Sequence, residues 1–372
     1  MVRKKFLLIW FSLLSIFLIL GSSMGISFVF AQELSSYDST KFGINYYSTH
    51  NHYEPKYLTD YVLDRDFSFF ENNEITDITV ALIWKYLEPT PGGYNDQALD
   101  DIERVCNFAS KYNLKVTINF YTMMQEDSFT IPEWIIPRKF EQVFLDPYIR
   151  QTWLNFLDYC AERLSSVEAI SSWHMMNEPA RKDWACDVEI EDFLDLWSEM
   201  RAIFKAYSDR PVSVRFAAQV FDDPNHFNKD CRIYEILDYI ALNWYENHCS
   251  REKLENMINE IRKYSDVELS EFGFKTDDDQ VQAWKYFDYV TFFKRLKITK
   301  CSAWMWRADY DSPNPEPAGF GFNIAKTFLG EPRQAFYFLQ EDQYFLQYYL
   351  PQFLIYYWKS QFPVFSILFS MF

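Results

Sequence analysis

Blocks of apolar and polar residues alternate along the chain from about residue 41 onward. Short runs rich in β-branched and apolar residues predict eight strands, at 41–47, 75–84, 114–122, 167–176, 211–218, 238–245, 266–274 and 298–306. Between these runs, apolar residues recur every three or four positions, which predicts amphipathic helices, for example at 95–113, 189–208 and 250–265. The chain is therefore expected to repeat a strand–helix unit.

Eight strand–helix units over about 300 residues predict an α/β fold, the (β/α)8 or TIM barrel. A doubly wound open sheet has the same alternation and is the competing architecture. It usually carries a glycine-rich phosphate loop after its first strand. The corresponding segment here, GINYYSTHNHYEP at 43–55, contains no such loop.

The barrel reading predicts where chemistry should lie, because active sites of this fold are built at the carboxyl ends of the strands. The fourth predicted strand ends in SSWHMMNEPA, where Asn177 and Glu178 follow an apolar run. The seventh ends in LSEFG, which contains Glu271. We therefore expect the two carboxylates to converge over the mouth of the barrel.

Two converging carboxylates suit the cleavage of a glycosidic bond. One must be protonated to assist the leaving oxygen, and the other must be ionised to attack or stabilise the oxocarbenium-like centre. Different surroundings can hold their pKa values apart. Glu178 and Glu271 are the candidate pair, and the amide of Asn177 is a candidate contact for the sugar 2-hydroxyl.

Polar and aromatic residues at the sixth and eighth strand ends extend this candidate site. Tyr245 could donate a hydrogen bond to the nucleophile, and Asn243 is a further candidate substrate contact. Trp304 and Trp306 have equal parity, so both are expected to face inward, with Trp306 as a floor for a sugar ring. The alternative for these tryptophans is simple core packing.

These motifs resemble those of the clan A glycoside hydrolases, most closely family 5, the cellulase and mannanase superfamily. The resemblance covers about residues 41–340, and we assign 36–340 to one catalytic domain. It implies that Glu178 is the acid/base, that Glu271 is the nucleophile, and that the reaction retains anomeric configuration. WKYLEPTPGGYN at 84–95 is also similar to the loop that follows the second strand in the family.

The chain departs from the family pattern at three places. Where the family usually has an arginine near the end of strand two, this sequence has Thr79. LKVTINFYT lacks the histidine often found on strand three, and Asn243 stands where the family commonly has histidine. Arg215 on the fifth predicted strand is a possible replacement for the missing guanidinium, although no spacing argument supports it.

Composition narrows the range of partners. The formal net charge of -17 excludes nucleic acid and anionic membrane surfaces as favourable partners, and it weighs against polyanionic substrates. Neutral β-linked glycans stay compatible with it. Aromatic residues make up 20% of the chain, which is expected either for a large aromatic core or for a groove with ring platforms.

Both ends of the chain are unusually apolar. Arg3, Lys4 and Lys5 precede an uncharged run at 6–31, which predicts either a secretory signal cut before Gln32 or an N-terminal membrane anchor. The protein is therefore expected outside the cell or on the outer face of its membrane. The aromatic tail at 342–372 is a candidate for an interfacial membrane contact, a hydrophobic dock or an end without function.

The six cysteines do not form a recognisable metal motif. Cys106 and Cys160 fall in predicted helices and are expected to be buried thiols, whereas Cys186, Cys231 and Cys249 lie in polar surroundings where a disulfide is plausible. No Cys-x-x-Cys or Cys/His cluster is present, so no metal or other cofactor is expected.

The sequence thus predicts an exported, metal-independent glycosidase that hydrolyses a β-1,4-linked glucan or mannan. An exo-acting β-galactosidase or β-mannosidase of the same clan is an alternative. A barrel that binds glycans without cleaving them is another, because the missing arginine and histidines weaken the family pattern. An intact acid/nucleophile pair favours the enzyme.

Overall fold

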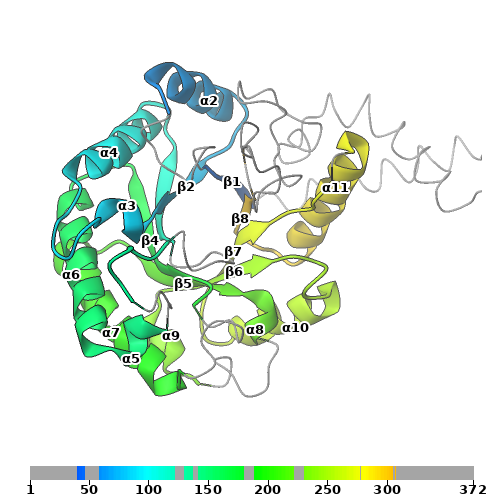
Figure 1. Ribbon diagram of the computed structural model, residues 1–372. Coiled ribbons are helices and arrows are strands. Elements are labelled where there is room, and N and C mark those ends of the chain that lie inside the picture. The colour runs from blue at the N-terminus through cyan, green and yellow to red at the C-terminus, as the bar shows by residue number, and fades with distance from the viewer. Residues whose placement is uncertain are drawn as a thin grey trace, which may run out of the picture.

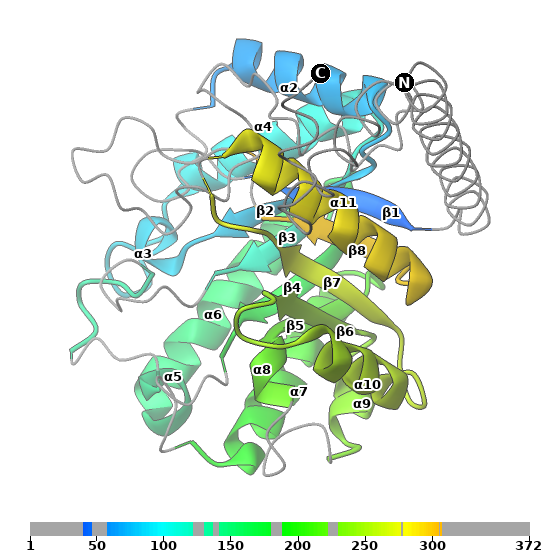
Figure 2. The ribbon, with the colours of Figure 1, turned by 90° about the vertical axis from the view of Figure 1, so that its right-hand side faces the viewer.

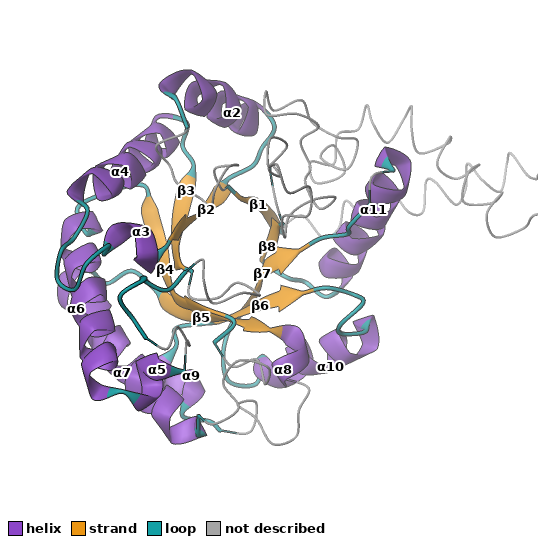
Figure 3. Ribbon diagram, viewed as in Figure 1, coloured by secondary structure: helices purple, strands orange, loops and turns teal. Residues whose placement is uncertain are grey.

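The structure, a computed structural model, describes residues 40–46, 58–121, 130–136, 141–179, 188–221, 230–276, 278–304 and 306. Eight parallel strands close into a barrel in chain order, with β8 paired to β1 (Figure 3). They are β1 (Lys41–Asn45), β2 (Asp77–Leu82), β3 (Lys115–Phe120), β4 (Ile170–Asn177), β5 (Val212–Ala217), β6 (Ile240–Trp244), β7 (Val267–Phe272) and β8 (Lys300–Ala303). The predicted TIM barrel and all eight predicted strands are confirmed.

The helices of the described part lie outside the strand ring (Figure 1). They are α2 (Asp60–Asn72), α3 (Trp84–Leu87), α4 (Asp96–Lys111), α5 (Gln142–Leu145), α6 (Pro147–Leu164), α7 (Ile190–Tyr207), α8 (Ala218–Phe221), α9 (Ile233–Ile236), α10 (Arg251–Ile261) and α11 (Asp279–Arg295). From the side, α11 lies along the outer surface of the barrel near β7 and β8 (Figure 2). The helices α4, α7 and α10 confirm the amphipathic runs identified in the sequence.

Capping residues set where several of these helices begin. The side chain of Asn95 accepts a hydrogen bond from the Ala98 amide at the start of α4, and Asp278 accepts two backbone amides at the start of α11. Asp146 does the same before α6, where Pro147 occupies the first helical position. Such side chains satisfy backbone donors that would otherwise have no partner in the first turn.

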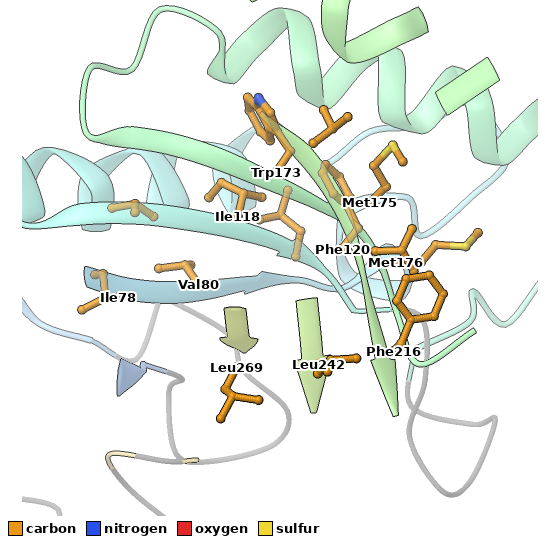
Figure 4. Packing of buried hydrophobic residues seen from close by; sticks show 14 of the residues in the cluster. Ile78, Val80, Ile118, Phe120, Trp173, Met175, Met176, Phe216, Leu242 and Leu269 are labelled. Atoms are coloured by element: carbon orange, nitrogen blue, oxygen red, sulfur yellow. The ribbon is translucent and has the colours of Figure 1, made fainter. Parts of the chain in front are cut away.

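The main hydrophobic core lies between the strands and the helices. Alternate residues of each strand point outward into it, as Figure 4 shows for Ile78, Val80, Ile118 and Phe120. The ring of Phe120 lies 5.4 Å from that of Phe204 on α7. Much of the aromatic content is therefore core. Trp153, Trp173, Trp197, Trp244 and Trp306 are all fully buried.

Inside the barrel, the amino-terminal parts of several strands form a buried ionic network. Glu268 on β7 contacts His174 Nε2 at 3.0 Å and Lys300 Nζ at 3.6 Å. Lys300 also lies 3.5 Å from Asp77 on β2, and the Tyr239 hydroxyl lies 2.8 Å from His174 Nε2. His174 is thus a partnered interior histidine at a distance from the strand ends where catalysis is expected.

Two pKa values in this network are lowered. Burial causes the decrease for His174, whereas neighbouring positive groups cause it for Glu268 against the effect of burial. Burial lowers the pKa of His174 to about 4, against the attraction of Glu268. Burial would raise the pKa of Glu268, but the positive charge of Lys300 and the bond to His174 outweigh it and lower that pKa to about 2. The folded protein therefore holds a neutral imidazole beside an ionised carboxylate at neutral pH.

The cysteine predictions are settled for the described residues. Cys106 and Cys160 are buried free thiols, as expected. Cys231 is an exposed free thiol, so no disulfide joins it to Cys249. Cys186 lies outside the described residues.

Both terminal predictions also concern residues outside the described part, since 1–31 and 342–372 lie beyond it. The described segment from 40 to 306 falls within the predicted domain of 36–340. In that segment, no helix is both long enough and apolar enough to cross a membrane.

Phe120→Ala is expected to lower the free energy of unfolding by about 3–5 kcal/mol, because it leaves a cavity between β3, α6 and α7. Chemical denaturation followed by circular dichroism measures this. Ile136→Ala is the control. Ile136 is 87% exposed, and its loss should change stability by less than about 0.5 kcal/mol. Equal effects of the two substitutions would contradict the packing described.

We also expect the melting temperature to fall on acidification from pH 6.5 to 4. In this range His174 binds a proton in the unfolded state but not in the folded state, where the pKa of His174 is about 4. A further loss should follow below about pH 4.5, where unfolded Glu268 protonates but the folded group, with a pKa of about 2, does not. His174→Gln should flatten the first part of the curve. The exposed position His248 provides the control, His248→Gln, which should leave the slope unchanged.

Candidate active site

The candidate site lies where β4, β5, β6 and β7 end, on neighbouring strands of the ring. Cα pairing places Asn177 beside Arg215 and Asn243 beside Glu271. The ladders shift register just before both glutamates, between His174 and Asn177 on β4 and between Leu269 and Glu271 on β7. Such irregularities re-aim side chains at the rims of barrels. The structure therefore brings these predicted residues from separate segments to one place.

Glu271 is a buried carboxylate with charged and neutral donors around it. Its side chain is 6% exposed. Tyr245 donates its hydroxyl to Glu271 Oε2 at 2.8 Å, as the sequence predicted, and Arg215 Nη2 lies 2.8 Å from Glu271 Oε1. Burial also keeps the pKa of the Tyr245 phenol well above its usual value, so this phenol stays a donor.

The pKa of Glu271 is raised to about 7. Burial is the main cause, and the negative charge of Glu178 adds to it. The Arg215 guanidinium opposes the rise, as do the hydrogen bonds of Tyr245 and Asn243. Glu271 thus titrates near neutrality in the unliganded protein.

Glu178 takes an unusual backbone conformation immediately after β4. Its φ is 50°, in the left-handed region that side chains rarely adopt, and its amide donates to the Arg215 carbonyl at 2.7 Å. Its Oε1 accepts a hydrogen bond from Asn243 Nδ2 at 3.0 Å. Backbone strain of this kind recurs at functional sites. Here it holds a half-buried carboxylate at the rim of the barrel.

Arg215 is fully buried in the barrel interior and ties several strands together. Its Nη2 donates to Asn45 Oδ1 at 3.0 Å and to the Ser270 carbonyl at 2.6 Å. Its Nε donates to Asn243 Oδ1 at 3.3 Å. Arg215, considered in the sequence as a replacement for the missing guanidinium, therefore does place a guanidinium beside Glu271.

Asn243 lies between the two glutamates. Its Oδ1 accepts from the Ser270 hydroxyl at 2.9 Å as well as from Arg215. Its Nδ2 donates to Glu178 and, at 3.4 Å, to the buried Asn177 Oδ1. Asn243 was predicted as a substrate contact, and in the structure its side chain forms these hydrogen bonds with protein groups of the site.

The two tryptophans of the eighth strand do not share one environment. Trp304 packs with Ala81, Tyr121 and Tyr245 at the strand ends, and its ring is stacked 6.4 Å from that of Tyr121. Trp306 is fully buried in the outer core, with its ring 4.8 Å from that of Phe70 on α2.

The prediction that both tryptophans face inward is therefore wrong for Trp306, and so is its role as the floor for a sugar. The reason is that β8 ends at Ala303, so the alternation of a strand no longer applies at Trp306. Of the two tryptophans, Trp304 lies beside the candidate site.

Sequence reasoning missed Asn45, Ser270 and Tyr121. Asn45 Nδ2 donates to the carbonyls of Ser270 and Ala303, and its Oδ1 receives Arg215. Each of these residues lies at or near the carboxyl end of a strand, at a position whose side chain is expected to point into the barrel. That position in the alternation is the signal that could have identified them. No group of three or more His, Cys, Asp or Glu side chains suited to a metal occurs in the described segments.

The chain is similar in structure to glycosidases of family 5. An exo-β-1,4-mannosidase from Opitutaceae bacterium strain TAV5 matches with a TM-score of 0.69 and 14% identity, over 83% of this chain and 60% of that one. A GH5_18 protein from Streptomyces cattleya, in complex with Manβ1-4GlcNAc, matches with a TM-score of 0.70 and 12% identity, over 83% and 81%. XacCel5A in complex with cellopentaose matches with a TM-score of 0.60 and 14% identity, over 81% of this chain and 98% of that one.

No protein-family profile matches the sequence, and no curated protein is significantly similar to it. The likeness to solved structures at these identities establishes the fold, a family 5-like TIM barrel. This chain spans 60% of the length of the mannosidase. Activity and substrate do not follow from the fold alone.

Glu178→Gln should lower the pKa of Glu271 below about 7, because it removes a neighbouring negative charge that raises this pKa. A carboxyl carbon NMR titration of the purified protein measures it without any substrate. Tyr245→Phe is the opposing variant and should raise the same pKa, since it removes a donor to the carboxylate. If both variants leave the titration unchanged, Glu178 and Tyr245 do not act on Glu271 as described.

Proposed function

We propose that this protein hydrolyses β-glycosidic bonds by a retaining, two-carboxylate mechanism, with Glu178 as acid/base and Glu271 as nucleophile. The observation that carries the proposal is that Glu178, after β4, and Glu271, on β7, lie close enough at the strand ends for the charge of Glu178 to raise the pKa of Glu271. One is held by Tyr245 and Arg215, and the other by Asn243. The structural likeness to family 5 glycosidases agrees with it.

In the first step Glu271 attacks the anomeric carbon while Glu178 gives its proton to the leaving oxygen. In the second step Glu178 takes a proton from water, which attacks the same carbon and releases Glu271. Tyr245 and Arg215 favour the ionised Glu271 that the first step needs, against the burial that raises its pKa. We assign the contact with the sugar 2-hydroxyl to Asn177, beside Glu178.

A neutral β-1,4-linked glucan or mannan is the substrate class we propose. The net charge of -17 disfavours polyanions. Among the similar structures, one is named an exo-β-1,4-mannosidase and another was solved with cellopentaose. Trp304, stacked with Tyr121 near Tyr245, offers an aromatic wall next to the nucleophile.

An exo-acting β-mannosidase is the second candidate within the same chemistry, favoured by the likeness to the mannosidase. An exo-acting β-galactosidase is a further form of that candidate. A glycan-binding barrel without turnover is the candidate from another class. The presence of both glutamates at the site argues against it, because binding alone does not require an acid and a nucleophile.

The test is hydrolysis of a panel of β-linked glucans, mannans, xylans and aryl glycosides by the full-length protein. We expect turnover of at least one member, and a loss of about 1,000-fold or more in Glu271→Gln, because the nucleophile is removed. Glu178→Ala should keep its first step on aryl glycosides with good leaving groups and should regain turnover with added azide.

Arg262→Lys is the matched control for these variants, because Arg262 donates to the carbonyls of Leu296 and Lys297 away from the site. It should retain wild-type rates. Binding of a panel member without turnover would instead support the glycan-binding barrel. Turnover that persists in Glu271→Gln would exclude Glu271 as the nucleophile.

A further inference from the structure

We propose that Arg215 and Asn243 form one positioning unit for both glutamates, supplied from β5 and β6. In this unit the guanidinium holds Glu271 and also fixes the amide of Asn243 so that its N–H group is directed at Glu178. The inference rests on the proposed function and assigns a role to two residues at positions where the chain departs from the family pattern.

The guanidinium beside Glu271 comes from β5. The family resemblance expects an arginine near the end of strand two, where this chain has the buried Thr79 on β2. Here Arg215 reaches Glu271 Oε1 at 2.8 Å from β5 instead. It is anchored by Asn45 Oδ1 and the Ser270 carbonyl, on β1 and β7. Because these hydrogen bonds fix the planar guanidinium of Arg215, it stays beside the Glu271 carboxylate.

Hydrogen bonds on both sides fix the orientation of the Asn243 amide. Its Oδ1 accepts from Arg215 Nε at 3.3 Å and from the Ser270 hydroxyl at 2.9 Å. An amide oxygen placed between two donors leaves the NH₂ group on the opposite side, where Nδ2 meets Glu178 Oε1 at 3.0 Å. Reversing the amide would set donor against donor and oxygen against carboxylate.

An asparagine at position 243 also affects which groups near Glu271 can ionise. The charged and titratable groups of the described part that face Glu271 are Glu178 after β4, Arg215 on β5 and Tyr245 after β6. A histidine at position 243 would add another titrating group between the two acids. The asparagine is neutral at all working pH values, so only the two glutamates need change ionisation during the reaction.

A pH-dependent double-mutant cycle tests the unit in the full-length protein. Arg215→Lys keeps the charge but loses the planar fork. Its kcat/KM relative to wild type should fall about 10-fold or more at pH 6, and the deficit should shrink as the pH rises toward 9. Asn243→Ala should cost about 10-fold to 100-fold, as for a lost hydrogen bond to a charged group.

If the two residues act together, the double variant should be no more than a few-fold worse than the poorer single variant. Additive losses with pH profiles parallel to that of wild type would overturn the proposal. Asn243→Asp serves as a second test because it keeps the acceptor for Arg215 and Ser270 but removes the donor toward Glu178. It should be at least as impaired as Asn243→Ala.

A titration of the Glu271 carboxyl by NMR separates this inference from the proposed function, because it needs no turnover. Arg215→Lys should raise the pKa of Glu271, whereas the remote control Arg262→Lys should not change it. If the wild type cleaves no glycoside, the proposed function fails while this titration still tests the contact. An unchanged pKa in Arg215→Lys would refute the role of Arg215.

Discussion

The ion pair between Arg215 and Glu271 is the interaction on which the site depends. Both side chains are buried, and taking two charges out of water costs more than their attraction returns unless the remaining donors are also satisfied. The guanidinium meets that condition through Asn45, Asn243 and the Ser270 carbonyl. The polar residues at the inner ends of β1, β6 and β7 are therefore explained by the arginine on β5.

The aromatic core gives this polar centre its rigidity. Rings such as Phe120, Trp173 and Trp244 pack between the strands and the surrounding helices, so the strand ends have little freedom to move apart. Within the described residues, many of the aromatic side chains thus serve packing, which is one of the two interpretations of the composition. Trp304 and Tyr121 are the rings that the structure places beside the site.

The fold could be predicted because its signals are local. Runs of β-branched residues alternating with helical periodicity identified every strand, and strand ends identified Glu178 and Glu271. The place of Trp306 could not be predicted from parity, since parity depends on where β8 stops pairing. The contacts of Arg215 and of His174 could not be predicted either, because each joins strands far apart in sequence through side-chain reach.

The barrel interior contains a second carboxylate that could compete with Glu271 for the arginine. Arg215 lowers the pKa of Glu268 as well as that of Glu271. Glu268, however, has Lys300 at 3.6 Å and His174 at 3.0 Å, and it is ionised with those partners. Because Lys300 balances the negative charge of Glu268, the Arg215 guanidinium remains directed at Glu271. The ionic network around Glu268 is thus part of what sets the electrostatics of the candidate site, although none of its members lies at the carboxyl ends of the strands.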